Sequence, residues 1–267
     1  APFVTDQTAL RELQDLSAAI GWWHQEHPLT RLPIVTLPEK SESPRDALTR
    51  AQAARLLMAA RGYRWDPDRL RPDGGRGGWV KRRGEDATLR RHLRRFVLVG
   101  LYTGTRPGVI PQLLWEESAT QAYVDLDAGM VYRRGRRERD RPTKRRPVVK
   151  LPRRLLAHMR RWRAEDQRRE AALLEAHLAA GERPETAPRL VSVMHFNGQP
   201  IAGRIRRGFK SLVQDAGLEG SALEATPHWM RHTCCTWLME RDCDPWEAAA
   251  YAGMSTLTLE KIYGHHR

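Results

Sequence analysis

The side chains of this sequence that best suit chemistry on a phosphate group lie in three short segments. The first segment is Leu101–Gly108, which reads LYTGTRPG and contains Arg106. Gly104 is a residue type that ends helices, and Pro107 suits the first position of a following helix. We therefore expect Arg106 at a helix N-terminus, where backbone N–H groups and the helix dipole favour an anion. An arginine there can clamp a phosphate, although an arginine in a Gly/Pro turn is usually just solvated.

The second segment is Thr226–Thr236, which reads TPHWMRHTCCT. Thr226 is a good helix N-cap, and Pro227 is a good first helical residue. On the predicted helix, His228 and Arg231 are three residues apart and therefore share one face. A histidine beside an arginine suits a phosphate that undergoes proton transfer.

Metal binding is the competing interpretation of the second segment, because His228 and His232 are four residues apart. The glutamate of the H-E-x-x-H pattern is replaced by Trp229, and no third ligand lies nearby in the sequence. We therefore predict no metal site and interpret His232 as a structural histidine, hydrogen-bonded in the core. The cysteines form no C-x-x-C pair and are predicted to be small buried residues of a reducing cytosol. They are Cys234, Cys235 and Cys243.

The third segment is Asp244–Met254, followed by a short C-terminal helix pattern. Asp244 and Glu247 are spaced like a capping box at a helix start, and Gly253 is placed to end that helix. The next helix brings Tyr263 to a position just before Gly-His-His. Taken alone, a tyrosine near the end of a chain is more often a packing residue than a catalytic one.

Together, the order and spacing of the three segments resemble the tyrosine recombinase, or phage integrase, family. That family has a T-G-x-R box, and this chain has Thr103–Arg106. The family's H-x-x-R-H box matches His228–His232, and its G-[H/W]-x8-Y box matches Gly253–Tyr263. The resemblance covers about residues 46–267.

The resemblance implies an enzyme that breaks and rejoins DNA without ATP, metal or cofactor. The hydroxyl of Tyr263 would attack a backbone phosphate, displace the 5′-oxygen and leave a 3′-phosphotyrosyl bond. Arg106 and Arg231 would hold the non-bridging oxygens as charge develops. His228 would assist proton transfer near the tyrosine, and Lys144 would be the acid for the 5′-oxygen.

Lys144 is assigned through the segment Thr143–Pro152, which resembles the hairpin that bears the family's catalytic lysine. Lys150 is the competing lysine, but it lies inside a predicted strand. Two positions depart from the family pattern. Met254 stands where the family usually has histidine or tryptophan, so one hydrogen-bond donor is missing. Val109 stands where many relatives have an acidic residue.

The sequence pattern predicts a mainly α fold with a small three-stranded antiparallel sheet (α+β), as in the catalytic domain of the family. These helices and strands must position the residues named above. Residues 1–45 are expected to be the terminal helix, over 7–26, of a truncated core-binding domain plus a proline-containing linker. Residues 46–267 are expected to be the catalytic domain. Residues 64–84 are interpreted as a basic surface loop. Strands are predicted at 122–126, 130–133 and 147–151. Further helices are predicted at 49–60, 87–102, 153–180, 201–216, 227–240, 245–252 and 256–263.

The charge balance indicates a polyanionic partner. Lys and Arg number 46 against 32 Asp and Glu, which gives a net charge of +14. Double-stranded DNA is the predicted partner, because neutralising its phosphates releases counterions. No apolar run approaches the about 20 residues of a membrane span, and no export signal is present, so a cytoplasmic protein is expected.

The resemblance further implies a bacterial or phage-encoded integrase of a mobile element that self-associates into a synaptic tetramer on DNA. Two alternatives stay open at the level of sequence. One is a DNA-relaxing enzyme similar to type IB topoisomerases, which carry similar residues. The other is a DNA-binding relative with impaired catalysis, although Tyr263, Arg106 and Arg231 are all present.

Overall fold

The chain consists of two compact units, residues 1–44 and 45–267. The structure, a computed structural model, describes residues 6–39, 47–83, 90–140, 145–201, 205–219 and 226–264. The first unit contains helix α1, Asp6–Glu26, which confirms the helix predicted over 7–26. None of the helices in the described ranges is long and apolar enough to cross a membrane.

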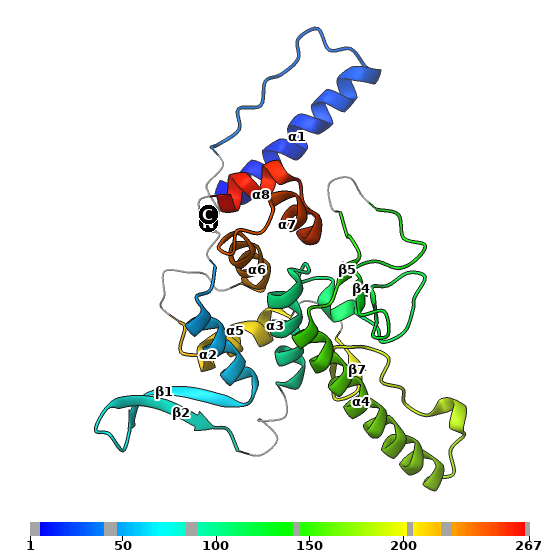
Figure 1. Cartoon of the computed structure of the whole chain (residues 1–267). Coiled ribbons are helices and arrows are strands. Elements are labelled where there is room, and N and C mark those ends of the chain that lie inside the picture. Colours follow the sequence, from blue (N-terminus) through cyan, green and yellow to red (C-terminus); the bar gives the residue numbers. More distant parts are fainter. Residues whose placement is uncertain are drawn as a thin grey trace, which may run out of the picture. The chain divides into compact units, whose positions relative to one another are not determined.

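The second unit is mainly helical with small antiparallel sheets, as predicted (Figure 1). Its helices are α2 (Arg50–Ala60), α3 (Arg91–Thr103), α4 (Arg153–Ala179), α5 (Arg206–Asp215), α6 (Trp229–Met239), α7 (Pro245–Ala252) and α8 (Thr256–Tyr263). The predicted three-stranded sheet has the order β3 (Tyr123–Asp125), β4 (Met130–Tyr132) and β5 (Val149–Lys150), all antiparallel. The short strands β6 (His195–Phe196) and β7 (Gln199–Pro200) pair as a second hairpin.

The prediction of a surface loop over residues 64–84 was wrong. Strands β1 (Tyr63–Leu70) and β2 (Arg76–Lys81) form an antiparallel hairpin there. Trp65 pairs with Trp79 across the two strands, with ring centroids 5.4 Å apart. The guanidinium of Arg55 on α2 lies 4.7 Å from the centre of the Trp65 ring. These ring contacts hold the hairpin against α2, and the Gly, Asp and Pro content concealed them in the sequence.

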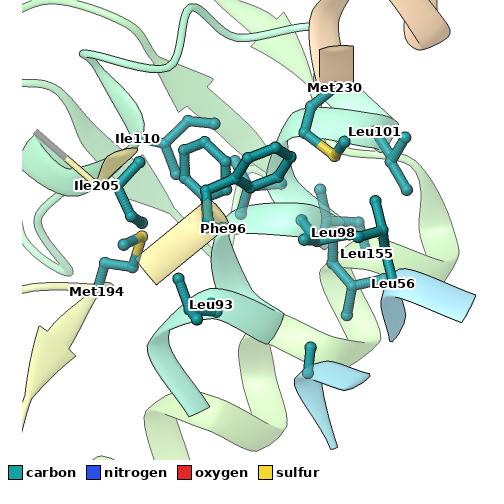
Figure 2. Packing of buried hydrophobic residues seen from close by; sticks show 14 of the residues in the cluster. Leu56, Leu93, Phe96, Leu98, Leu101, Ile110, Leu155, Met194, Ile205 and Met230 are labelled. Atoms are coloured by element: carbon teal, nitrogen blue, oxygen red, sulfur yellow. The ribbon is translucent and has the colours of Figure 1, made fainter. Parts of the chain in front are cut away.

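Helix α3 is the central element of the core. It contacts α2, α4, α5 and α6, and nearly every side chain from Leu93 to Thr103 is buried. Figure 2 shows Phe96 surrounded by apolar side chains from other elements. Its ring meets that of Phe209 on α5 edge to face at 6.0 Å. Helix α3 therefore lies at the centre of the core, and the packing around it fixes the position of its C-terminal end.

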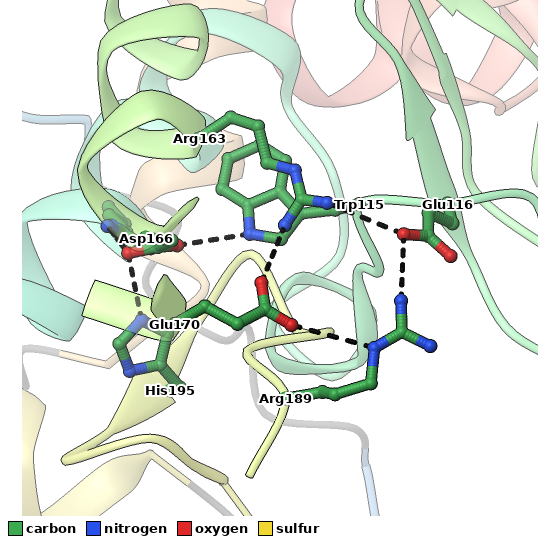
Figure 3. Close-up of polar contacts among 8 residues, drawn as sticks. Trp115, Glu116, Arg163, Asp166, Glu170, Arg189 and His195 are labelled. Atoms are coloured by element: carbon green, nitrogen blue, oxygen red, sulfur yellow. Dashed lines mark hydrogen bonds and ion pairs between the residues drawn. The ribbon is translucent and has the colours of Figure 1, made fainter. Parts of the chain in front are cut away.

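A buried ionic network attaches α4 to α3 (Figure 3). Asp166 accepts two hydrogen bonds of 2.7 Å from Arg95, one of 3.0 Å from the Trp115 indole and one of 3.1 Å with the ring of His195. Burial alone would raise the pKa of Asp166, but these hydrogen bonds from His195 and Arg95 lower it to about 2. The carboxylate therefore stays charged and keeps α4 fixed to the core.

Capped helix ends fix the positions of the chain segments that carry the candidate site residues. Gly104 and Gly253 end α3 and α7 in the left-handed conformation, with φ of 60° and 69°, as the sequence predicted. Asp244 caps the start of α7, and the Ser255 hydroxyl caps the start of α8. The two glycines end helices and the two N-caps start them, and together they fix the helix ends close to the candidate site residues.

A close approach of α3 and α6 gives a prediction for stability. A Cβ atom on Gly100 would lie 2.6 Å from the Cβ of Met230. Replacing a helical Gly by Ala adds about 1 kcal/mol of helix propensity, whereas overpacking costs about 1–3 kcal/mol. Gly100→Ala should therefore lower the free energy of unfolding by up to about 2 kcal/mol, despite the better helix propensity, as measured by urea denaturation. Gly108→Ala is the control, because a Cβ there meets nothing within 4 Å. Equal stability of the two variants would show that α3 and α6 separate freely.

Candidate active site

Three predicted site residues share one electrostatic environment around the ends of α3, α6 and α7. Arg106 follows α3, while His228 and Arg231 lie at the start of α6. The charges of Arg106 and Arg231 act on each other and on His228. Tyr263 is the last residue of α8, which packs against α6. Lys144 lies outside the residues that the structure describes.

Two local predictions about this region were wrong. Arg106 does not lie at a helix N-terminus, because a hydrogen bond of 2.9 Å from Val109 N to Arg106 O closes a turn. The helical residues that follow are a single 3-10 turn, Ile110–Gln112. The N-cap of α6 is His228 and not Thr226, and no side chain caps it. Arg106 is therefore positioned by helix C-termini, which have the opposite polarity from the one expected.

Arg231 bridges the C-terminal ends of α3 and α7. Its Nη1 donates to the carbonyl of Gly104 at 2.7 Å and to that of Ala252 at 2.6 Å. The last carbonyls of a helix lack intrahelical partners and carry partial negative charge, so they suit a cation. The guanidinium is mostly buried, yet its Nη2 and Nε make no hydrogen bond within the described residues. These donors remain for a ligand.

Arg106 is held in a similar way at the end of α7. Its Nη2 donates to the carbonyl of Gly253 at 3.3 Å, and its Nη1 donates to that of Arg145 at 2.6 Å. Burial lowers its pKa, and the positive charges of Arg231 and Arg146 lower it further. Arg106 remains a cation at neutral pH, and its Nε makes no hydrogen bond within the described residues.

A third arginine, Arg133, was missed by the sequence analysis. It follows β4 and is 3% exposed. Its Nε donates to Thr105 Oγ1 at 3.0 Å, its Nη1 donates to Tyr251 O at 2.7 Å, and its Nη2 donates to Thr103 O. Burial lowers its pKa to about 10. Arg133 therefore joins the loop before Arg106 to the end of α7 from the interior side.

The site is positive, although the negative charge of Asp140 acts on Arg106 and partly opposes the effect of the neighbouring arginines. Arg106, Arg133 and Arg231 form no ion pair in the described part of the chain. Desolvation lowers the pKa of His228, and the charges of Arg231 and Arg106 add to that effect. Hence His228 is a neutral donor or acceptor at neutral pH. A cluster of buried arginines beside a neutral histidine suits an anion such as a phosphate.

Tyr263 is 2% exposed and packs in an apolar cluster formed by α6, α7 and α8. Its hydroxyl is 2.7 Å from Nδ1 of His232. His232 was predicted to be a structural histidine of the core, but the structure places it against the candidate nucleophile. Met254, in the same cluster, is half-buried and makes apolar contacts. Within the described residues, no group of three His, Cys, Asp or Glu could hold a metal ion.

A family model described as Phage integrase family matches residues 83–267. Comparison with curated proteins gives no match. Among solved structures, the Tn1549 transposon integrase in complex with transposon right end DNA has a TM-score of 0.62 and 15% identity, covering 97% of this chain and 75% of that chain. The same integrase with circular intermediate DNA has a TM-score of 0.61 and 17% identity, with coverage of 97% and 75%. XerH site-specific recombinase bound to difH substrate has a TM-score of 0.55 and 14% identity, covering 98% and 62%. At these identities, the likeness shows a shared fold.

The arginine cluster predicts a specific effect of inorganic phosphate on thermal stability. Phosphate at about ten times its Kd should stabilise the protein by about 1.4 kcal/mol. The melting temperature should then rise by about 3–6 °C. Arg231→Gln should remove most of this increment, whereas Arg160→Gln, which changes an exposed arginine on α4, should keep it. An equal loss in both variants would mean that phosphate acts on the overall positive charge.

Proposed function

Because the chain belongs to the phage integrase family, we propose that it is a site-specific recombinase that cuts and rejoins double-stranded DNA through a covalent bond to Tyr263. The main support is the arrangement of Arg106 and Arg231 at two adjoining helix ends, beside the helix whose His232 contacts the tyrosine hydroxyl. The net charge of +14 suits a DNA partner. The related Tn1549 integrase and XerH structures are complexes with DNA.

In the proposed reaction, the oxygen of Tyr263 forms a bond to phosphorus as the bond from phosphorus to the 5′-oxygen breaks. The unused donors of Arg231 and Arg106 bind the non-bridging oxygens, whose negative charge grows in the transition state. His228, which is neutral and exposed beside these arginines, adds a hydrogen bond to the same phosphate. Attack by a 5′-hydroxyl of a partner strand reverses the step and restores the free tyrosine.

Lys144 is proposed as the acid that protonates the departing 5′-oxygen. The ester bond to Tyr263 conserves the energy of the broken phosphodiester, so the reaction needs neither ATP nor a metal ion. Residues 1–45 are proposed as the last helix of a core-binding domain with its linker, and residues 46–267 as the catalytic domain. We further propose that the protein assembles as a tetramer on DNA in the cytoplasm of a bacterial cell, as part of a mobile element.

Replacement of the nucleophile is the first test. A nicked DNA site should trap a protein–DNA adduct that survives SDS, and Tyr263→Phe should abolish it because the attacking oxygen is gone. DNA binding should be unchanged, as measured by gel shift. Tyr132→Phe is the control, because that tyrosine stacks on Tyr123 in the sheet. An adduct of normal yield in the Tyr263→Phe protein would contradict the assignment.

The role of Lys144 can be separated from that of a second lysine by changing the leaving group. Lys144→Ala should slow cleavage by about a hundredfold or more, because the 5′-oxygen departs without a proton. A substrate with sulfur at the bridging 5′ position should restore the rate, since a thiolate leaves without protonation. Lys150→Ala is the control and should cleave normally, because Lys150 is exposed on β5. If the sulfur substrate instead rescues a defect of Lys150→Ala, the two lysines have been assigned the wrong way round.

A further inference from the structure

We propose that His232 is a catalytic residue that accepts the proton of the Tyr263 hydroxyl as the tyrosine attacks DNA. This inference rests on the proposed recombinase function and assigns a role that the sequence boxes gave to His228. Tyrosine has an ordinary pKa near 10, so at neutral pH the hydroxyl needs an acceptor to become a good nucleophile. A histidine within hydrogen-bond distance is the residue type most often used for this purpose.

The geometry places the acceptor on the reacting atom. Nδ1 of His232 is 2.7 Å from the hydroxyl oxygen of Tyr263, a distance at which the O–H can donate directly to the ring nitrogen. The two residues lie on packed helices, α6 and α8. Tyr263 is 2% exposed and packs in an apolar cluster, and His232 is half-buried, so the hydroxyl proton is largely shielded from water. A proton acceptor inside the protein is therefore needed at this point.

His228 is better placed for the phosphate than for the tyrosine. Its ring centroid is 6.5 Å from that of His232, whereas the His232 ring is 5.9 Å from the Tyr263 ring and hydrogen-bonded to it. Desolvation lowers the pKa of His228, and the positive charges of Arg231 and Arg106 lower it further. The two histidines of the H-x-x-R-H segment thus have different proposed roles. His228 donates a hydrogen bond to the phosphate, and His232 accepts the proton of the tyrosine.

Two neighbouring side chains on α6 cannot take up this proton. Cys235, on the next turn of α6, makes a side-chain hydrogen bond with Tyr263. Burial raises the pKa of the Cys235 thiol, so it stays protonated and cannot act as a base. Arg231 precedes His232 on α6 and is a cation, which cannot accept a proton. Within the described residues, His232 is thus the basic group in contact with the tyrosine oxygen.

In the proposed step, two proton transfers accompany the exchange of bonds at phosphorus. The O–H bond of Tyr263 breaks, its proton moves to Nδ1 of His232, and the tyrosine oxygen forms a bond to phosphorus. The bond from phosphorus to the 5′-oxygen breaks, and that oxygen takes a proton from Lys144. In rejoining, the incoming 5′-hydroxyl gives its proton back to Lys144, and His232 returns its own to the tyrosine. No oxidant, metal or further reactant is required.

The test uses His232→Asn, because the amide oxygen of Asn lies near the position of Nδ1. It keeps a hydrogen-bond acceptor for Tyr263 but cannot take up the proton. Single-turnover cleavage of a nicked site should fall by about a hundredfold to ten-thousandfold. The wild-type rate should rise with pH and level off once the histidine has lost its proton. The His232→Asn rate should instead keep rising toward the pKa of free tyrosine, about 10.

His228→Asn is the matched control and should be slower than wild type but should keep the plateau in its pH profile. His232→Asn with a normal rate, or with a reduced rate and an unchanged plateau, would overturn the proposal, because a positioning role alone explains both results. Melting temperature and DNA binding of each variant show whether the fold is intact. If His232→Asn does not fold, His232→Gln, which leaves the amide near the Nε2 position, carries the same test.

A sulfur at the bridging 5′ position separates this inference from the proposed function. His232→Asn should gain nothing from the sulfur substrate, because its defect concerns the nucleophile and not the leaving group. Rescue by sulfur would place His232 on the leaving-group side and overturn the proposal. Failure of the proposed function has a different signature, since the wild-type protein would then form no adduct that depends on Tyr263.

Discussion

The carbonyl groups at the C-terminal ends of α3 and α7 hold three guanidinium groups, and the active site depends on this interaction. Arg231 bridges the two ends, Arg106 binds the end of α7 from outside, and Arg133 joins both ends from the interior. Unpaired helix carbonyls would be costly to bury, and so would unpaired guanidinium groups. Each set satisfies the other, so the three guanidinium groups are held by backbone carbonyls and by hydroxyl oxygen rather than by direct ion pairs among the described residues.

The geometry of those helix ends comes from packing far from the phosphate. α3 can approach α6 closely because Gly100 has no side chain to meet Met230. This contact brings the turn after Gly104 next to Arg231. Gly253 then ends α7 in the left-handed conformation and turns its carbonyl toward Arg106. The two glycine caps thus determine where the cations lie, and the apolar core determines how rigidly they are held.

Local sequence patterns predicted most of this fold, and contacts between distant residues account for what they missed. Helix periodicity and cap residues gave the helices to within a few residues, and motif spacing selected Arg106 and Tyr263. The hairpin at 63–81 was missed because its stability comes from ring contacts across strands and with α2. Arg133 stands in a run of similar basic residues, and tertiary packing alone distinguishes it. The contact of His232 with Tyr263 could not be predicted, because the two residues are 31 positions apart in the chain.

The two departures from the family pattern have opposite effects on the attraction between this site and a phosphate. Val109 supplies no negative charge, and Met254 supplies no hydrogen-bond donor, so stabilisation of the phosphate falls to the cations. An acidic residue at position 109 would neutralise part of their field, whereas Val109 adds no negative charge to that of Asp140. The phosphate carries one negative charge before attack and approaches two in the pentacovalent transition state. In the proposed reaction, the net positive field of these arginines would favour the transition state over the bound substrate, which is the condition for catalysis. Loss of the acidic residue thereby offsets part of the loss of a donor at Met254.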